Sequence, residues 1–310
     1  MAGIFESRSD MLDDAQVRAA MFVHLERVSA LHPEGVTSAE INQFSVAGQP
    51  MKLVVQPGIW KPAALEAALT IRTTYTPPSQ LPPYEDAIAP GGLVKYAYRG
   101  TDPNHSDNRA LRTAMQDERP LAYFIGVAKG VYQAQFPVYV VAEQREELAF
   151  LIAVDEGQRL VDPDLVASLT PDRRSYLERL VRARLHQPVF RARVLQAYEK
   201  QCAMCRLQHT DLLDAAHIVR DSDEGGLPVV PNGLSLCKIH HAAYDRNIIG
   251  VRPDLIVQVR RDVLTEIDGP MLKHGIQAMH GVRLTVPSHR AARPDADRLD
   301  QRYDEFLAAG

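Results

Sequence analysis

Residues 201–250 read QCAMCRLQHTDLLDAAHIVRDSDEGGLPVVPNGLSLCKIHHAAYDRNIIG and contain every cysteine of the 310-residue chain. Cys202 and Cys205 form a Cys-x-x-Cys pair, and Cys237 begins a Cys-x-x-His pair that ends at His240. Four such ligands at this spacing are typical of a structural zinc site, which leaves no open position for water. We therefore expect these four side chains to hold Zn²⁺. An odd number of cysteines excludes a complete disulfide framework, and this use of thiols fits a reducing compartment.

Further motifs follow in the same stretch, in the order AHI, NGLSLC and HHAAYD. This order resembles the HNH nuclease module, and the resemblance implies a ββα-metal fold. It implies that His217 on the first strand is the general base, because a neutral imidazole takes a proton from water near pH 7. His241 on the helix would bind a catalytic divalent ion, Mg²⁺ or Mn²⁺, that neutralises the leaving oxygen. Asn232 in the connection would fix the loop and orient His217.

The chain departs from this family pattern at one position. Many relatives carry an acidic metal ligand directly before the catalytic histidine, where this chain has Ala216. Asp214 on the same predicted strand and Asp245 one helical turn beyond His241 are candidates to replace it. The sequence does not choose between the two carboxylates, and we place Asp214 first.

A basic stretch precedes the cysteines. Residues 171–206 contain nine lysines and arginines against three acids, although the whole chain has a formal charge of -4. Such a stretch can neutralise DNA phosphates, and a solvated helix face is the alternative interpretation. The candidate phosphate contacts are Arg182, Arg184, Arg191 and Arg193.

The chain changes character toward its N-terminus. Apolar residues at helical spacing predict a helix over residues 13–32, and Thr37 with Glu40 forms a capping-box pattern for a second, short helix. Short apolar runs then predict a mainly β domain, namely MKLVV, LVKYAY, LAYFIGV, FPVYVV and ELAFLIAV. The length favours two domains, and we divide the chain into residues 1–160 and 161–310. The predicted class is α+β.

Four segments of the first domain carry a second resemblance: GIWKP at 58–62, PPYEDAI at 82–88, LVKYAYRGTDPNHSDNRALRTA at 93–114 and RPLAYFIGVAKGVYQAQFPVYVV at 119–141. They resemble the SRA-like domains fused to HNH nucleases, which are PUA-like β-barrels that bind a flipped, modified cytosine. A flipped base needs aromatic faces and an acceptor for its exocyclic amine. The resemblance implies a β-barrel with flanking helices and a base pocket formed by Tyr84, Asp86 (or Glu85), Tyr96, Tyr98 and Arg99.

Together these patterns predict a modification-dependent, type IV-like restriction endonuclease. It would act on double-stranded DNA carrying 5-methylcytosine or 5-hydroxymethylcytosine, as a homodimer because one active site cuts one strand. An HNH nuclease reading phosphorothioate or another modified base is one alternative, and a non-catalytic zinc-containing DNA-binding protein is another. No run approaches the about 18 apolar residues of a membrane span, and the N-terminus has no secretion signal, so we expect a cytoplasmic protein without membrane contact.

Overall fold

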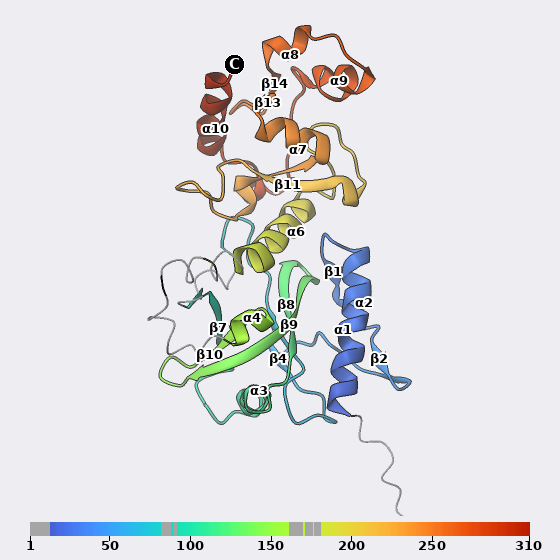
Figure 1. Cartoon of the computed structure of the whole chain (residues 1–310), viewed down its shortest axis with the longest axis vertical. Helices are drawn as coiled ribbons and strands as arrows, with labels where there is room; N and C mark the ends of the chain where they lie inside the picture. Colours follow the sequence, from blue (N-terminus) through green and yellow to red (C-terminus); the bar gives the residue numbers. More distant parts are fainter. Residues whose placement is uncertain (1–12, 82–87, 90–91, 161–169, 171–175, 177–180) are drawn as a thin grey trace, which may run out of the picture.

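The computed structural model has two parts that follow each other along the long axis of the molecule (Figure 1). It describes the chain except for residues 1–12, 82–87, 90–91, 161–169, 171–175 and 177–180. The N-terminal half is built on a large sheet, and the C-terminal half on several two-stranded sheets and short helices. This mixture confirms the predicted α+β class.

The N-terminal half contains an eight-stranded, curled sheet. Its strand order is β4-β5-β8-β9-β10-β7-β6, with β1 paired to β9, and only β5 and β8 run parallel. The long strand β9 pairs with β8 through its first part and with β10 through its second, so the sheet bends into an open half-barrel. The strands are β1 (Val36–Thr37), β4 (Ile59–Trp60), β5 (Thr70–Thr73), β6 (Ile88–Ala89), β7 (Leu93–Ala97), β8 (Leu121–Ala128), β9 (Val131–Gln144) and β10 (Ala149–Ala153).

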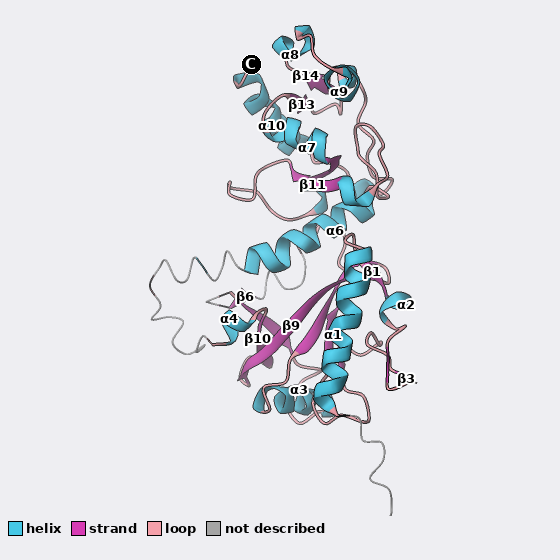
Figure 2. Ribbon diagram, turned by 45° about the vertical axis from the view of Figure 1, so that its right-hand side comes forward, coloured by secondary structure: helices cyan, strands magenta, loops and turns pink. Residues whose placement is uncertain are grey.

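Helices cover both faces of this sheet (Figure 2). Because side chains alternate along a strand, Phe124 of β8 packs with the residues of α1, whereas Tyr123 and Ile125 pack with those of α3. This explains why β8 is apolar and buried almost throughout. The helices of this half are α1 (Asp14–Leu31), α2 (Ser38–Ile41), α3 (Ser106–Gln116) and α4 (Glu156–Arg159).

Local sequence patterns explain most of these elements. Asp13 caps α1 by accepting a hydrogen bond from the Ala15 amide, and the predicted capping box of Thr37 and Glu40 is present at α2. The strand predicted from MKLVV is wrong. The amides of Leu53 and Val54 donate to the side-chain oxygen of Asn42 and not to a neighbouring strand, while β2 (Ser45–Val46) and β3 (Gln49–Pro50) form a small hairpin just before them.

The C-terminal half begins with α6 (Gln187–Ala197), which directly follows a π-helical turn (Arg182–His186). Two strands, β11 (Leu213–His217) and β12 (Gly233–Cys237), pair antiparallel and are followed by α7 (Lys238–Asp245), which gives the predicted ββα unit. The remaining elements are β13 (Ile249–Val251), β14 (Val257–Val259), α8 (Arg261–Thr265), α9 (Pro270–Gly275) and α10 (Ala296–Ala308), with 3₁₀ turns at Thr210–Leu212, Val230–Asn232, Gln277–Met279 and Arg290–Ala292.

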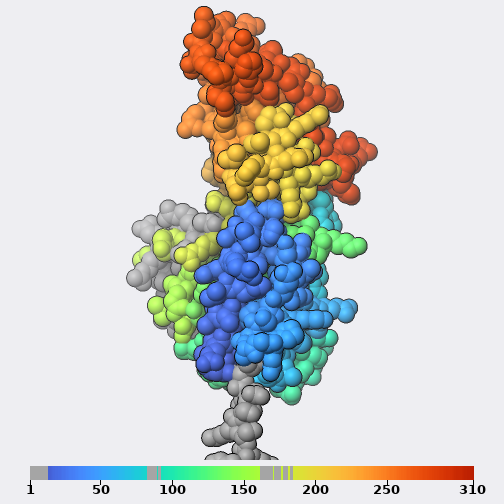
Figure 3. Space-filling model, turned by 90° about the vertical axis from the view of Figure 1, so that its right-hand side faces the viewer, coloured from blue at the N-terminus to red at the C-terminus, as the bar shows by residue number. Residues whose placement is uncertain are grey.

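Helix α6 belongs to the cores of both halves. Val189 and Ala192 pack into the core of the sheet, whereas Phe190, Val194 and Leu195 pack with the ββα unit. The space-filling view shows the N-terminal helices in contact with the C-terminal half at this level (Figure 3). No described helix combines the length and apolar character that a membrane span needs.

Candidate active site and zinc site

The four predicted zinc ligands lie together, two of them before β11 and two at the junction of β12 and α7. The ligand atoms of Cys202, Cys205, Cys237 and His240 all lie within 4.8 Å of one another. His240 Nδ1 is 3.4 Å from the Cys202 sulfur and 3.2 Å from the Cys237 sulfur. Zinc bond lengths in a tetrahedral site give an N···S separation of roughly 3.6 Å, so this donor set fits a bound divalent ion.

A hydrogen bond from Nε2 of His240 explains why its other nitrogen, Nδ1, faces the cysteine sulfurs. Nε2 lies 2.7 Å from the carbonyl oxygen of Gly275 in α9 and therefore donates its proton there. This bond leaves the lone pair of Nδ1 directed at the cysteines, and it is the kind of outer contact that orients a metal-binding histidine. The Ala203 amide also donates to the Ser235 carbonyl at 2.7 Å, which ties the Cys-x-x-Cys turn to β12.

A second group of side chains surrounds His241 on α7. Asp214 Oδ2 from β11 lies 3.5 Å from His241 Nδ1, and Asp245 Oδ2 lies 3.4 Å from His241 Nε2. Both carboxylates that the sequence offered therefore contact the same imidazole, at opposite nitrogens. Asp214 is the more buried of the two, with a side chain 30% exposed against 58% for Asp245.

The charge of Asp214 is fixed by its neighbours. Burial alone would raise the pKa of this carboxyl, but hydrogen bonds from His241 and Lys238 hold the pKa well below its usual range. Lys238 Nζ lies 3.0 Å from Asp214 Oδ2, and the guanidinium of Arg191 lies 3.5 Å from Oδ1. Asp214 is therefore ionised at neutral pH, as a ligand of a divalent cation must be.

His217 at the end of β11 stands against an aromatic ring. Phe190 of α6 stacks on the imidazole with 4.0 Å between ring centroids and 16° between planes. Burial is the main cause that lowers the pKa of His217, so the ring is neutral at pH 7 and able to accept a proton. Its Nε2 is buried and has no hydrogen-bond partner among the described residues.

Asn232 holds the segment that follows His217. It is completely buried, accepts from the Val219 amide at 2.9 Å, and donates to the carbonyls of Val219 and Leu227, each at 3.0 Å. The Ile218 amide donates to the main-chain oxygen of Asn232 at 2.9 Å. All the partners of Asn232 are backbone groups, so its side chain fixes the course of the chain directly after His217.

Gly233 is a structural residue that the sequence analysis did not single out. A Cβ at this position would lie 2.5 Å from Val194 Cγ2 and 2.9 Å from Phe190 Cζ. Helix α6 therefore rests directly on the backbone of β12, and this close approach places Phe190 beside His217. Gly233 belongs to the NGL motif. Its contact with α6, some forty residues earlier in the chain, could not be predicted, because such a long-range contact leaves no residue spacing in the sequence.

His217, His241 and Asp214 line one cavity of about 660 Å³. Its other walls include Gln187, Phe190 and Arg191 of α6, and also Ser29, Pro33 and Gln133 of the N-terminal half. No residue before α6 was predicted to line the nuclease site. Such long-range neighbours leave no local motif in the sequence.

The four arginines proposed as phosphate contacts have different surroundings. Arg191 donates to the Pro33 carbonyl at 3.0 Å and to the Leu213 carbonyl at 2.9 Å. Arg193 is 2% exposed and donates to the carbonyls of Pro77 at 2.8 Å and Gln80 at 2.9 Å. Both arginines thus join the two halves of the molecule. Arg184 is 55% exposed and lies 3.3 Å from Asp155, and the side chain of Arg182 lies outside the described residues.

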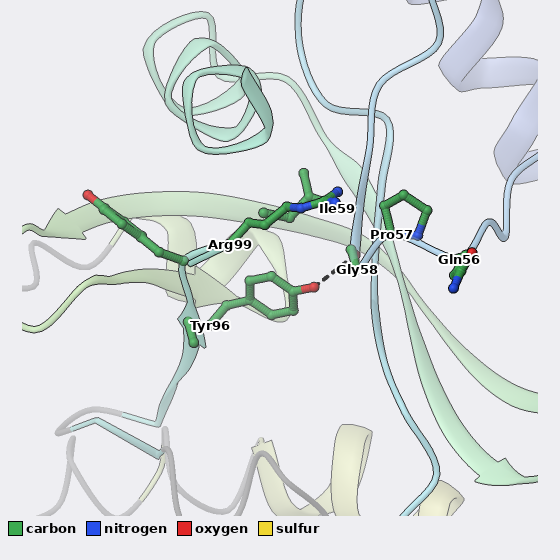
Figure 4. Close-up of a pocket in the computed structure, with 8 residues that line it drawn as sticks. Gln56, Pro57, Gly58, Ile59, Tyr96 and Arg99 are labelled. Carbon is green, nitrogen blue, oxygen red and sulfur yellow. Dashed lines mark hydrogen bonds between the residues drawn. The ribbon is translucent and has the colours of Figure 1, made fainter. Parts of the chain in front are cut away.

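A second cavity, of about 480 Å³, lies in the N-terminal half (Figure 4). It is lined by Gln56, Pro57, Gly58, Ile59, Tyr96, Ala97, Tyr98 and Arg99. Three of the five predicted base-pocket residues, Tyr96, Tyr98 and Arg99, therefore meet at one cavity. The other two, Tyr84 and Asp86, lie outside the described residues. The neighbouring Gln56 was not predicted.

The two tyrosines of this cavity are anchored by their hydroxyl groups. Tyr96 donates to the Gly58 carbonyl at 2.8 Å, with the Arg72 carbonyl also within 2.9 Å, as the dashed line to Gly58 indicates (Figure 4). Tyr98 donates to the carboxylate of Glu143, which also accepts from Arg112 Nε at 2.8 Å. The bond from Arg112 lowers the pKa of Glu143 to about 2, so this buried anchor is charged.

Comparisons with known proteins agree with the ββα unit. Residues 202–252 match the family model described as HNH endonuclease. Among solved structures, the chain is similar to the modification-dependent restriction endonuclease TagI, with 17% identity, a TM-score of 0.27, and coverage of 88% of this chain and 93% of that one. It is also similar to the type IV phosphorothioation-dependent restriction endonuclease ScoMcrA, with 14% identity, a TM-score of 0.21, and coverage of 81% and 53%. No curated protein matches the chain. The zinc-type ligand cluster, the ββα unit and the family match together identify residues 202–252 as an HNH endonuclease domain.

Proposed function

We propose that this chain is a modification-dependent DNA endonuclease. The HNH domain hydrolyses phosphodiesters, and the N-terminal half holds a flipped 5-methylcytosine or 5-hydroxymethylcytosine in an SRA-like pocket. The observation that carries the proposal is the meeting of His217, His241 and Asp214 at one cavity within the HNH domain. A neutral imidazole beside a histidine–carboxylate pair is the donor set that metal-assisted phosphodiester hydrolysis needs.

The residues of this site have distinct proposed roles as general base, positioning residues and metal ligands. His217 accepts the proton of the attacking water, and Phe190 and Asn232 hold its ring and backbone in place. His241 and Asp214 would hold the divalent ion, with Asp245 as the second carboxylate available to it. Mg²⁺ or Mn²⁺ bound there supplies charge neutralisation at the phosphate and at the leaving oxygen. Zn²⁺ at Cys202, Cys205, Cys237 and His240 would be structural, because that set has no place for substrate.

The cavity beside β7 supports the base-reading part of the proposal. Tyr96 and Tyr98 line this cavity from the core of the sheet, each less than a tenth exposed, and the amide side chain of Gln56 offers both a donor and an acceptor for a Watson–Crick edge. Tyr84 and Asp86, which lie outside the described residues, remain the proposed stacking and acceptor groups. The half-exposed Arg184, together with Arg182, is the proposed phosphate contact. Because one active site cuts one strand, cleavage of both strands implies two copies of the chain on the DNA.

The test is cleavage of matched plasmids that are unmodified, cytosine-methylated or hydroxymethylated, with Mg²⁺ or Mn²⁺, by the wild type and by His217→Ala. We expect the wild type to cut modified DNA only and His217→Ala to cut none. Equal cutting of all plasmids would refute the cytosine reader, and a plasmid set with phosphorothioate or other marks would then identify the true one. If the wild type cut no plasmid but bound DNA as His217→Ala does, the chain would be a binding protein.

A further inference from the structure

We propose that the N-terminal half completes the nuclease site, with Gln133 of β9 orienting the water molecule that His217 deprotonates. This inference rests on the proposed nuclease function. It starts from the cavity of about 660 Å³, whose walls come from both halves. Gln133 and Ser29 reach it from the N-terminal half, and His217, His241 and Asp214 reach it from the HNH domain.

Three of the residues that line this cavity each carry a buried polar atom without a partner among the described residues. Gln133 Oε1, Ser29 Oγ and His217 Nε2 are each buried without a hydrogen-bond partner among the described residues. A buried polar atom left unpaired costs free energy, so nearly all such atoms in folded proteins are bonded. Three of them around one cavity indicate that a small polar ligand belongs there.

Water is the ligand whose chemistry fits these groups. Neutral His217 accepts at Nε2, and an amide oxygen such as Gln133 Oε1 accepts only. One water molecule can donate one O–H to each, which leaves an oxygen lone pair free to attack. In the reaction this oxygen bonds to phosphorus while its proton passes to His217 Nε2. The bond from phosphorus to the 3′ oxygen breaks with its electron pair, and that oxygen takes a proton from solvent.

The contacts between the two halves are specific enough to hold this arrangement. Arg191 of α6 donates to the Pro33 carbonyl and also lies beside Asp214. Lys200 Nζ forms an ion pair of 2.8 Å with Glu34, whose side chain is only 4% exposed. Gln196 donates to the Glu34 carbonyl at 3.0 Å. The loop after α1 is therefore fixed against α6, next to the wall that carries Ser29.

The experiment uses the full chain with Gln133→Ala, Gln133→Glu and the control Gln135→Ala. Gln135 lies on the same strand, does not line the cavity, and donates to the Val154 carbonyl at 3.1 Å. Two rates are measured for each protein, single-turnover cleavage of the modified plasmid and hydrolysis of bis(p-nitrophenyl) phosphate, a phosphodiester that bypasses base reading. DNA affinity in Ca²⁺ and the dependence of rate on pH complete the set.

We expect Gln133→Ala to slow both reactions about 10- to 100-fold, the size of effect that loss of reactant orientation produces, with unchanged DNA affinity. Gln133→Glu keeps an acceptor oxygen and should recover part of the rate. Its added negative charge favours protonated His217, so the acidic limb of the rate profile should move to higher pH. Gln135→Ala should lower the urea midpoint and leave both rates unchanged per folded molecule.

Other outcomes would overturn the inference in distinguishable ways. Equal rates for Gln133→Ala and the wild type would refute the role of Gln133 and leave the nuclease intact. Faster cutting of unmodified DNA by Gln133→Ala would show that the N-terminal half restrains the site, which is the opposite role. A wild type that hydrolyses neither substrate would refute the proposed function and the inference together.

Discussion

The contact between Gly233 and α6 allows a quantitative prediction for Gly233→Ala. The backbone of Gly233 is extended, with φ -129° and ψ 142°, so alanine causes no backbone strain and the effect is purely steric. The new methyl group would lie 2.5 Å from Val194 and 2.9 Å from Phe190, against an ordinary carbon–carbon contact of about 3.5–4.0 Å. Both neighbours are at most 2% exposed and cannot move into solvent, so α6 must shift by about 1 Å.

Overpacking of this kind costs about 1–3 kcal/mol, and we expect about 2 kcal/mol from urea unfolding. Because Phe190 supports His217, the same shift should slow DNA cleavage about 10- to 100-fold. The control is Gly269→Ala, since that glycine has φ -66° and no atom within 4 Å of an added Cβ. Val194→Ala in the Gly233→Ala background opens space and should restore part of the cleavage rate.

Two results would refute this reasoning at different points. A Gly233→Ala protein within about 0.5 kcal/mol of the wild type would refute the tight packing of α6 on β12. A destabilised protein that cleaves DNA at the wild-type rate per folded molecule would keep the packing and refute the link from Phe190 to His217.

Three further predictions concern other parts of the molecule. Chelation of the metal, or Cys237→Ser, should unfold the C-terminal half at a lower temperature, and added Zn²⁺ should restore the wild type only, as circular dichroism melting would show. The pKa of Glu143 is lowered by Arg112, so its stabilisation is fully present above pH about 4.5 and is lost as the pH falls through about 2. Glu143→Gln should therefore cost up to about 3 kcal/mol in urea unfolding at pH 7 and much less near pH 2. Arg184→Ala should weaken binding of modified and unmodified DNA alike and reduce the slope of log affinity against log salt by about 1; a loss confined to modified DNA would contradict a phosphate contact.

The ββα unit could be predicted from sequence because its parts are close in the chain. The four predicted zinc ligands, Asn232 and both histidines of the HNH motif fall within residues 201–250, so their order in the sequence carries the resemblance to the HNH module, which implies the two strands and the helix. Asp214, placed first as a substitute for the acid missing at Ala216, does contact His241, as Asp245 also does. Asp214 stands two residues earlier on the same strand, and alternation puts the two side chains on one face.

The shared cavity could not be predicted, because its walls meet only in the folded chain. Gln133 and Ser29 lie on a strand and a helix whose own patterns specify the sheet core. The irregular course of MKLVV has a similar cause. Its apolar residues suit a strand, but the side chain of Asn42, about ten residues earlier, bonds the amides that a strand would pair. Propensity was overridden by one tertiary contact.

In the basic stretch before Cys202, a count of positive charges predicts DNA contacts, but the packing of α6 gives its arginines a different role. Helix α6 is apolar on two sides, with Val189 and Ala192 facing one core and Phe190 and Val194 the other. A helix with apolar residues on two sides packs between two cores, as α6 does. An arginine on such a helix reaches backbone carbonyls more readily than a phosphate in solvent, as Arg193 does. The positive charge of α6 therefore serves first to fix the two halves against each other, and we place the proposed phosphate contact at Arg184 before α6, whose side chain is 55% exposed.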